Sequence, residues 1–435
     1  MTNLEIGWAS VAAMLALIGL RVPIGLSLGL VSIAGIAAIR GWSVGFGMVR
    51  TALFDFSAHW SLSAVPMFLL MGAVAHYSGV SESLFAAARA WFGRLPGGLA
   101  VASNFACAAF SAASGSSVAT AAAMGRITIP EMLKAGYQPG LATGVVASAG
   151  TLGSMIPPSI LMVIYGVFAE VSISEMFMAG VLPGLLTAGI YALMILVRCR
   201  LRTELAPPID AHYTLRQKLV SLRGVWPLFA LIVGILGGLY GGVFTATEAG
   251  AVGAFLSFAI AGVQGRLNRA VIRESVVEAV VGTSRILFVA LGAVLFTRLV
   301  ALTGISMFLA REIGAWAVDP LTLVLGASLI YFVLGMFLDP LGLMLLTLPI
   351  LMPLFERMDL DMIWFGILVI KYIEIGLLTP PVGLNVYVVK SVAGPAVPLD
   401  VAFRGVAWFL VCEAIVLTLL IAFPQIALFL PELMR

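Results

Sequence analysis

Charged side chains are scarce in this sequence. Its 435 residues include 24 Lys and Arg and 21 Asp and Glu, so only 10% are charged. A soluble domain carries about 25%. Hydrophobic residues make up 61% of the chain, which predicts a polytopic membrane protein. A net charge of +3 without a basic tract gives no indication of a nucleic-acid partner, and none is expected.

Cysteine and histidine are also scarce, with three of each. The cysteines are widely separated and the histidines lack the spacing of metal ligands, so neither a disulfide framework nor a transition-metal site is expected. The sequence has no Walker loop, no His-Glu-x-x-His motif and no nucleophile elbow. An enzyme is therefore not expected. Any energy that the protein uses would come from an ion gradient or a partner, because the standard motifs for ATP binding are missing.

The most informative segment is 376–385, Gly-Leu-Leu-Thr-Pro-Pro-Val-Gly-Leu-Asn, which interrupts an apolar run from Trp364 to Val392. Two adjacent prolines remove two backbone donors and the glycines loosen the chain, so a continuous helix cannot pass through it. At membrane depth the freed carbonyls must be satisfied by protein, water or an ion. A broken helix of this kind predicts a binding site. The alternative is a kinked helix that serves packing alone.

A second break of the same kind occurs at 153–159, Gly-Ser-Met-Ile-Pro-Pro-Ser, 223 positions earlier. The offset superimposes the first glycine and both prolines of one break on those of the other. Paired interruptions in two halves of a chain indicate the binding site of a transporter. We therefore interpret the chain as a first repeat, a cytoplasmic basic linker and a second repeat, at 1–203, 204–224 and 225–435.

Each half is predicted to contain five membrane-spanning helices, because apolar runs of about 20 residues suffice to cross a bilayer. The fourth span of each half is the broken one. The expected spans are 5–22, 23–40, 60–78, 138–168 and 175–197 in the first half, and 226–243, 246–264, 286–303, 361–393 and 402–423 in the second.

Each half also contains an apolar region before its broken helix, at 98–133 and 321–356. Polar tips at 114–117 and 339–340 divide these regions into arms of about 15 residues, which is short for a full crossing. They are predicted to be re-entrant helical hairpins whose tips stop near the midplane. The predicted fold class is an all-α polytopic membrane protein with two inverted-topology repeats, each with a re-entrant hairpin and a broken transmembrane helix.

The distribution of Lys and Arg predicts the orientation. The joint between the halves is basic and should be cytoplasmic, because it carries Arg198, Arg200, Arg202, Arg216, Lys218 and Arg223. Counting spans from there makes 265–285, which includes Arg285, cytoplasmic, and its counterpart 41–60 external. The charge bias flips between equivalent positions, as an inverted repeat requires. Both termini are then predicted to be periplasmic.

Segments 41–58 and 265–284 do not resemble spans, because they mix charged and apolar residues at helical spacing. Such a pattern is typical of interfacial helices. Two interpretations stay open. Each segment is either an arm that links a fixed part to a moving part, or an ordinary surface helix.

Small polar residues at the tips and breaks are the candidate ligands. Hydroxyl and amide oxygens and freed carbonyls suit a small hard cation, and the N-terminus of a half-helix suits a carboxylate. The alternative interpretation of the serine-rich tip is a motif of small residues that lets membrane helices pack closely. Asp339, an acid at membrane depth, either helps bind a cation or caps the following half-helix.

Two other groups of polar residues have structural explanations. Lys371 and Glu374 lie three residues apart on one helical face before the second break, and we interpret them as a structural pair. A substrate role for Lys371 is the alternative. Glu248, in Thr-Ala-Thr-Glu at 245–248, is expected to cap the helix that follows it.

The sequence resembles the large membrane subunit of TRAP (tripartite ATP-independent periplasmic) transporters, the DctM-like family. Four segments carry the resemblance, in family order and at family spacing. They are Ser-Gly-Ser-Ser-Val-Ala-Thr-Ala at 114–121 with Ile-Pro-Glu-Met at 129–132, Ile-Pro-Pro-Ser at 156–159, Tyr-Gly-Gly-Val-Phe-Thr-Ala-Thr-Glu-Ala at 240–249, and Leu-Thr-Pro-Pro-Val-Gly-Leu-Asn at 378–385. Together they extend over nearly the whole chain.

The resemblance implies a sodium-coupled secondary transporter for organic acids in the bacterial inner membrane. It implies the fold of the ion-transporter superfamily and an elevator mechanism, in which the hairpins and broken helices move as a body against a scaffold. Na⁺ is the implied coupling ion, and no organic cofactor is implied. Two partners are implied, a small four-helix DctQ-like membrane subunit and a DctP-like periplasmic substrate-binding protein.

The resemblance also implies the site residues, with the substrate between the tips and no arginine assigned to its carboxylate. The implied sodium ligands are Ser114, Gly115, Ser116, Ser117, Gly153, Pro157, Asp339, Gly376, Thr379, Pro380 and Asn385. The implied substrate contacts are Ser116, Thr120, Pro158, Ser159, Pro381 and Gly383.

Two alternative functions stay open on the sequence. The first is a stand-alone sodium/anion symporter or antiporter of the same architecture, which would work without a periplasmic binding protein. The second is a non-transporting membrane scaffold or a channel, which would not need small oxygen-bearing residues at both breaks.

Overall fold

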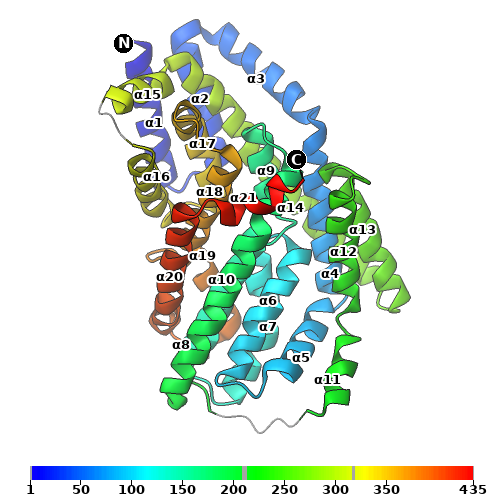
Figure 1. Cartoon of the computed structure of the whole chain (residues 1–435). Coiled ribbons are helices and arrows are strands. Elements are labelled where there is room, and N and C mark those ends of the chain that lie inside the picture. The colour runs from blue at the N-terminus through cyan, green and yellow to red at the C-terminus, as the bar shows by residue number, and fades with distance from the viewer. Residues whose placement is uncertain (1, 208–212, 316–318, 435) are drawn as a thin grey trace.

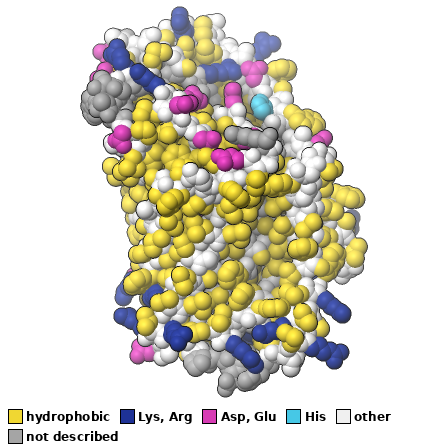
Figure 2. Space-filling model, viewed as in Figure 1, with side chains coloured by type: hydrophobic (Ala, Val, Ile, Leu, Met, Phe, Trp, Pro, Cys, Tyr) yellow, Lys and Arg dark blue, Asp and Glu magenta, His cyan; other side chains and the backbone are white. Residues whose placement is uncertain are grey.

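The computed structural model describes residues 2–207, 213–315 and 319–434, and no strand occurs in these ranges (Figure 1). Six of the described helices are long and apolar enough to cross a membrane, or up to eight if each of two bent pairs is one span. Apolar side chains fill the middle of the face seen in Figure 2, and Lys and Arg gather toward its two ends. This distribution suits a lipid-facing belt, and it agrees with the predicted all-α polytopic membrane fold.

The first half of the chain contains ten α-helices. They are α1 (Asn3–Gly19), α2 (Ile24–Arg40), α3 (Trp42–Ser57), α4 (Ala64–Tyr77), α5 (Val80–Phe92), α6 (Gly98–Ser114), α7 (Ser117–Lys134), α8 (Pro139–Met155), α9 (Ile160–Phe168) and α10 (Ile173–Leu201). A 3-10 turn at Trp60–Ser63 leads directly into α4.

In the described residues that follow, eleven further α-helices occur. They are α11 (Leu215–Leu222), α12 (Trp226–Tyr240), α13 (Ala246–Val263), α14 (Arg269–Thr303), α15 (Ile305–Ala315), α16 (Pro320–Gly335), α17 (Pro340–Arg357), α18 (Met362–Leu378), α19 (Leu384–Ala393), α20 (Leu399–Ala422) and α21 (Gln425–Glu432). Part of the predicted linker, 208–212, lies outside the described residues. The division into two inverted repeats stays a prediction.

Both predicted hairpins and both predicted breaks are present in the backbone. The α6–α7 hairpin turns at Gly115, whose positive φ of 61° ends α6. The α16–α17 hairpin turns before Asp339, which caps α17. The broken helices are α8–α9, bent by 40°, and α18–α19. Each first half-helix ends before its Pro-Pro pair, because proline has no N–H to continue the hydrogen-bond ladder.

The helix α14 corrects one prediction. A separate interfacial helix at 265–284 and a span at 286–303 were expected, but α14 is one helix of 35 residues. No proline interrupts it. Asn268 caps its start, because its side chain accepts a hydrogen bond from the Val271 N–H at 2.9 Å, and Gly304 ends it with a φ of 72°. Arg285 therefore lies near the middle of one long helix, not at the end of a separate interfacial helix.

Close approaches of glycines fix two helix crossings. A Cβ on Gly144 of α8 would lie 2.5 Å from the Gly405 carbonyl oxygen of α20, and a Cβ on Gly292 of α14 would lie 2.5 Å from the Gly25 carbonyl oxygen of α2. Small residues let membrane helices pack backbone to backbone. The helix α14 also packs along α4, and α6 and α7 pack against α8 (Figure 1).

The predicted cap at Glu248 is confirmed. The Thr245 side chain accepts a hydrogen bond from the Glu248 N–H at 3.4 Å, and the Glu248 carboxylate accepts one from the Thr245 N–H at 2.8 Å. The two residues form a capping box that starts α13.

Candidate functional site

The first hairpin tip contacts the first break directly. The Ile160 N–H donates to the Gly115 carbonyl at 3.2 Å. The Ser117 hydroxyl lies 3.1 Å from the Thr151 carbonyl and 2.5 Å from the Ser154 hydroxyl. Serine and backbone oxygens of both segments therefore converge at this tip.

Glycine is required at two positions of this contact. A Cβ on Gly115 would lie 2.8 Å from the Pro158 carbonyl oxygen, and one on Gly153 would lie 2.6 Å from the Ser116 carbonyl oxygen. Real Cβ atoms do not approach backbone atoms so closely, so larger residues would separate tip from break. These two glycines explain how the hairpin tip reaches the broken helix.

The second hairpin contacts the second break below its tip. A Cβ on Gly376 would lie 2.9 Å from the Gly335 carbonyl oxygen, at the end of α16. The Thr379 hydroxyl donates to the Ile375 carbonyl at 2.7 Å. Asp339 accepts from the Gly342 N–H at 3.1 Å, so the capping interpretation of this residue is confirmed.

Several buried oxygens of the broken helices have no hydrogen-bond partner among the described residues, including Glu374 Oε1 and Ser148 Oγ, and two of them lie within the breaks themselves. These two are Asn385 Oδ1 and Ser159 Oγ, and both side chains are fully buried. The Asn385 amide donates to the Ala147 carbonyl of α8 at 3.2 Å, which orients its oxygen. An unsatisfied buried polar group is destabilising by about 1–3 kcal/mol. Such oxygens are suitable ligands for a hard cation, and binding the cation would satisfy them.

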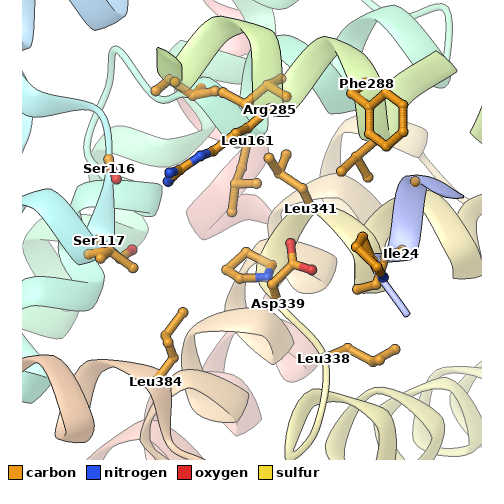
Figure 3. Close-up of a pocket in the computed structure, with 18 of the residues that line it drawn as sticks. Ile24, Ser116, Ser117, Leu161, Arg285, Phe288, Leu338, Asp339, Leu341 and Leu384 are labelled. Atoms are coloured by element: carbon orange, nitrogen blue, oxygen red, sulfur yellow. The ribbon is translucent and has the colours of Figure 1, made fainter. Parts of the chain in front are cut away.

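A cavity of about 810 Å³, here called the tip cavity, brings both hairpin tips together (Figure 3). Its wall on one side is formed by α2 and α14. Predicted site residues that line it are Gly115, Ser116, Ser117 and Asp339, together with Ser154 and Leu384 of the two broken helices. The paired tips of the sequence analysis therefore do face one space.

Other predicted substrate contacts do not line the tip cavity. Thr120 hydrogen-bonds to the Ser114 hydroxyl at 2.5 Å inside the hairpin. Pro158 and Pro381 do not line this cavity, and Pro381 is exposed. Pro380, which was predicted as a sodium ligand, is also exposed and does not line it. Of the predicted substrate residues, Ser116 has the most direct access.

The sequence analysis assigned no arginine to the site, but Arg21 and Arg285 both line the tip cavity. Arg285 had been counted as part of a cytoplasmic segment. A signal was present in the sequence, because the residues three and four positions away along the helix are Val281, Gly282, Phe288 and Val289. An arginine without a helical acidic neighbour in an apolar run indicates a functional position.

A buried ionic cluster lies beside the second break. Lys371 Nζ is 2.9 Å from Glu374 Oε2 and 2.8 Å from Glu413 Oε2, and none of the three side chains is exposed. The ammonium also donates to the Thr187 hydroxyl at 3.0 Å, and the Tyr191 hydroxyl donates to Glu413. The predicted Lys371–Glu374 pair is confirmed. Lys371 does not line the tip cavity, which favours a structural role.

Apolar helices that carry paired hairpins and broken helices around a shared cavity define the class as a membrane transport protein. Two solved transporters have the same fold. YdaH of Alcanivorax borkumensis matches with a TM-score of 0.62 at 15% identity, over 89% of this chain and 90% of that one. MtrF of Neisseria gonorrhoeae matches with a TM-score of 0.56 at 13% identity, over 86% and 84%.

The family follows from the sequence comparison. The profile of the "Tripartite ATP-independent periplasmic transporter, DctM component" family matches residues 11–426, and the chain belongs to this family. The resemblance found in the motifs is therefore confirmed.

Similar proteins include the C4-dicarboxylate TRAP transporter large permease protein DctM of Pseudomonas aeruginosa, 36% identical over 87% of this chain and 88% of that one. The sialic acid TRAP transporter large permease protein SiaM of Vibrio cholerae is 32% identical over 98% of each. These relatives are named as transporter permeases and not as enzymes, in agreement with the sequence analysis.

Proposed function

We propose that this chain takes up an organic acid through the tip cavity, driven by Na⁺ and supplied by a periplasmic binding protein. The observation that carries the proposal is the convergence of both hairpin tips on a cavity with two arginines and one carboxyl. With both arginines charged, Arg21 and Arg285 outweigh Asp339. A site with this balance favours an anion.

The relatives support an acidic substrate. Three of them are named for C4-dicarboxylate, sialic acid and isethionate. All three compounds are anions at neutral pH, two with carboxylate groups and one with a sulfonate. A carboxylate or sulfonate with a small organic body is the substrate class that we propose for this chain.

Sodium would bind where oxygens converge. At the first tip these are Ser117, Ser154 and the Thr151 carbonyl, and at the second break Asn385 presents an unpartnered oxygen. Bound Na⁺ adds positive charge beside the half-helix that starts at Ser117, whose N-terminus favours an anion. At each site, oxygens of a hairpin tip and of a broken helix would bind the same Na⁺, and the ion would thereby hold tip and break together. A substrate anion is thereby stabilised only when the cation is present.

The contacts between α3 and α14 support an elevator motion. Arg298 of α14 lies 3.0 Å from the Asp55 carboxylate and donates to the Thr51 hydroxyl at 2.8 Å and to the Met48 carbonyl at 3.1 Å. These contacts link α3 to α14. We propose that α3 and α14 belong to the scaffold and that the hairpins and broken helices move against it.

Two partner chains complete the proposal, a small DctQ-like membrane subunit and a DctP-like binding protein. One relative, the isethionate permease DctMQ of Oleidesulfovibrio alaskensis, is 33% identical and this chain covers 58% of it. Its name joins the M and Q parts, which supports a small-subunit partner. We place the complex in the bacterial inner membrane with both termini periplasmic.

The test is uptake into proteoliposomes that hold this chain and its small-subunit neighbour. Labelled succinate, sialic acid and isethionate would be supplied under an inward Na⁺ gradient, with and without the cognate binding protein. Uptake that requires both Na⁺ and the binding protein is expected. Sodium-driven uptake without the binding protein would favour the stand-alone symporter, and no uptake of any acid would contradict the proposal.

A further inference from the structure

Arg285 lies next to the apolar half of α14, and its side chain is exposed at the tip cavity. It is near the centre of the 35-residue α14, and its side chain belongs to the lining of the tip cavity. A guanidinium at the edge of an apolar segment is costly against lipid, so a polar space or a partner is expected beside it. The cavity is that space.

Within the described residues Arg285 makes no hydrogen bond or ion pair. Two other arginines that pack against this part of the fold differ from it. Arg298 pairs with Asp55, and Arg266 donates to the Ser78 carbonyl at 2.9 Å. Those two fasten helices together. Arg285 links no two helices, although its planar guanidinium carries five N–H donors that could bind a ligand.

The acidic residues that line the tip cavity and a neighbouring second cavity do not neutralise Arg285. Asp339 lines the tip cavity and Glu278 lines a second cavity, but neither forms an ion pair with the guanidinium. Figure 3 shows the Arg285 side chain reaching from α14 toward the Ser116 side of the tip cavity. The positive charge therefore stands opposite the hairpin tip, where the half-helix α7 begins.

Arg285 also stands where two cavities meet. The second cavity, of about 360 Å³, extends along α4, α7 and α14 to His76 and Arg126. The residues common to both cavities are Leu69, Ser116, Val118, Gly282 and Arg285. A ligand at this junction would be reachable from either cavity, and Arg285 is the charged residue of that shared set.

We propose that Arg285 binds the anionic group of the substrate, a carboxylate or sulfonate, from the α14 wall while Ser116 contacts it from the hairpin tip. The planar guanidinium fork matches two oxygens of such a group in parallel hydrogen bonds. Because Arg285 lines both cavities, it would hold the anion where the tip cavity meets the second cavity. This inference rests on the proposed function and adds to it the residue that recognises the anion.

The test compares Arg285→Gln and Arg285→Lys with the control Arg273→Gln in the reconstituted complex. Arg273 lies on the same helix, is exposed, pairs only with Glu274 and lines neither cavity. Uptake of labelled succinate, sialic acid and isethionate is measured with the binding protein, and binding of ²²Na⁺ is measured in parallel to report folding.

We expect Arg285→Gln to raise the KM for the acid that the wild type takes up by about 10- to 100-fold. Arg285→Lys should have a smaller effect, because it keeps the charge and loses the fork. Binding of ²²Na⁺ should be retained in both variants, and Arg273→Gln should behave as the wild type.

A succinate analogue with one carboxylate replaced by an amide sharpens the test if succinate is the acid taken up. The wild type should discriminate against the amide, and Arg285→Gln should discriminate less. An unchanged KM in Arg285→Gln, with normal wild-type uptake, would overturn the role of Arg285 alone. Absence of wild-type uptake of all three acids would instead overturn the proposed function and this inference together.

Discussion

Lys371 Nζ of α18 and Glu413 Oε2 of α20 lie 2.8 Å apart, and neither side chain is exposed. Glu374, on the same helix as Lys371, lies 2.9 Å from the ammonium, so Lys371 pairs with one carboxylate of α18 and one of α20 just before the second break. Removing one partner of a fully buried ion pair strongly destabilises the protein, because the remaining charge stays buried without a partner or solvent.

Lys371→Met should therefore destabilise the protein by about 3–5 kcal/mol. Thermal unfolding of the purified protein in detergent measures this. Glu374→Gln should be milder, because the Lys371–Glu413 pair stays balanced. The matched control is Lys134→Met, whose side chain is 76% exposed and whose pair with Glu131 is worth little. Equal melting temperatures for Lys371→Met and the wild type would contradict this account of the cluster.

Gly153→Ala should weaken transport, because its Cβ would meet the Ser116 backbone at 2.6 Å and push the first tip from the first break. A destabilisation of about 1–3 kcal/mol is expected from such overpacking. The control Gly189→Ala has nothing within 4 Å of its added Cβ and should be neutral. Uptake and melting temperature are measured for both variants. The same uptake in both would show that the contact is not needed.

Pro380→Ala combined with Pro381→Ala should reduce uptake more than membrane insertion. The pair ends α18 at Leu378 and separates it from α19, and alanines would allow the helix to continue through the break. Yield in the membrane fraction and initial uptake rate are compared, with Pro183→Ala in the middle of α10 as a control for helix-internal proline. Parallel losses of yield and uptake would favour a kinked helix that serves packing alone.

The hairpins and breaks were predictable because glycine and proline act locally. Pro157 and Pro380 stop helices through their own missing N–H groups, and Gly115 turns the chain through its own φ. The partner of Lys371 on its own helix was predictable for the same reason, since Glu374 lies one turn away.

The remaining features depend on tertiary contacts that spacing does not encode. Glu413 joins the cluster from α20, and Thr120 turns into its hairpin toward Ser114. The position of Arg285 at the tip cavity was not predicted, because counting basic residues by segment treats every arginine as a surface charge, whereas α14 continues without interruption and brings this residue to the cavity. A check for apolar neighbours at helical spacing would have found it.

The central claim is that oxygens at the tips and breaks bind the Na⁺ that drives uptake. The most direct measurement is the Na⁺ concentration for half-maximal uptake in the wild type and in Asn385→Ala. The matched control is Asn104→Ala, also fully buried, with one amide bond to the Ala188 carbonyl at 2.9 Å and remote from the breaks in sequence. The account predicts a rise of about tenfold for Asn385→Ala alone. An unchanged Na⁺ dependence in Asn385→Ala, or the same rise in the control, would contradict it.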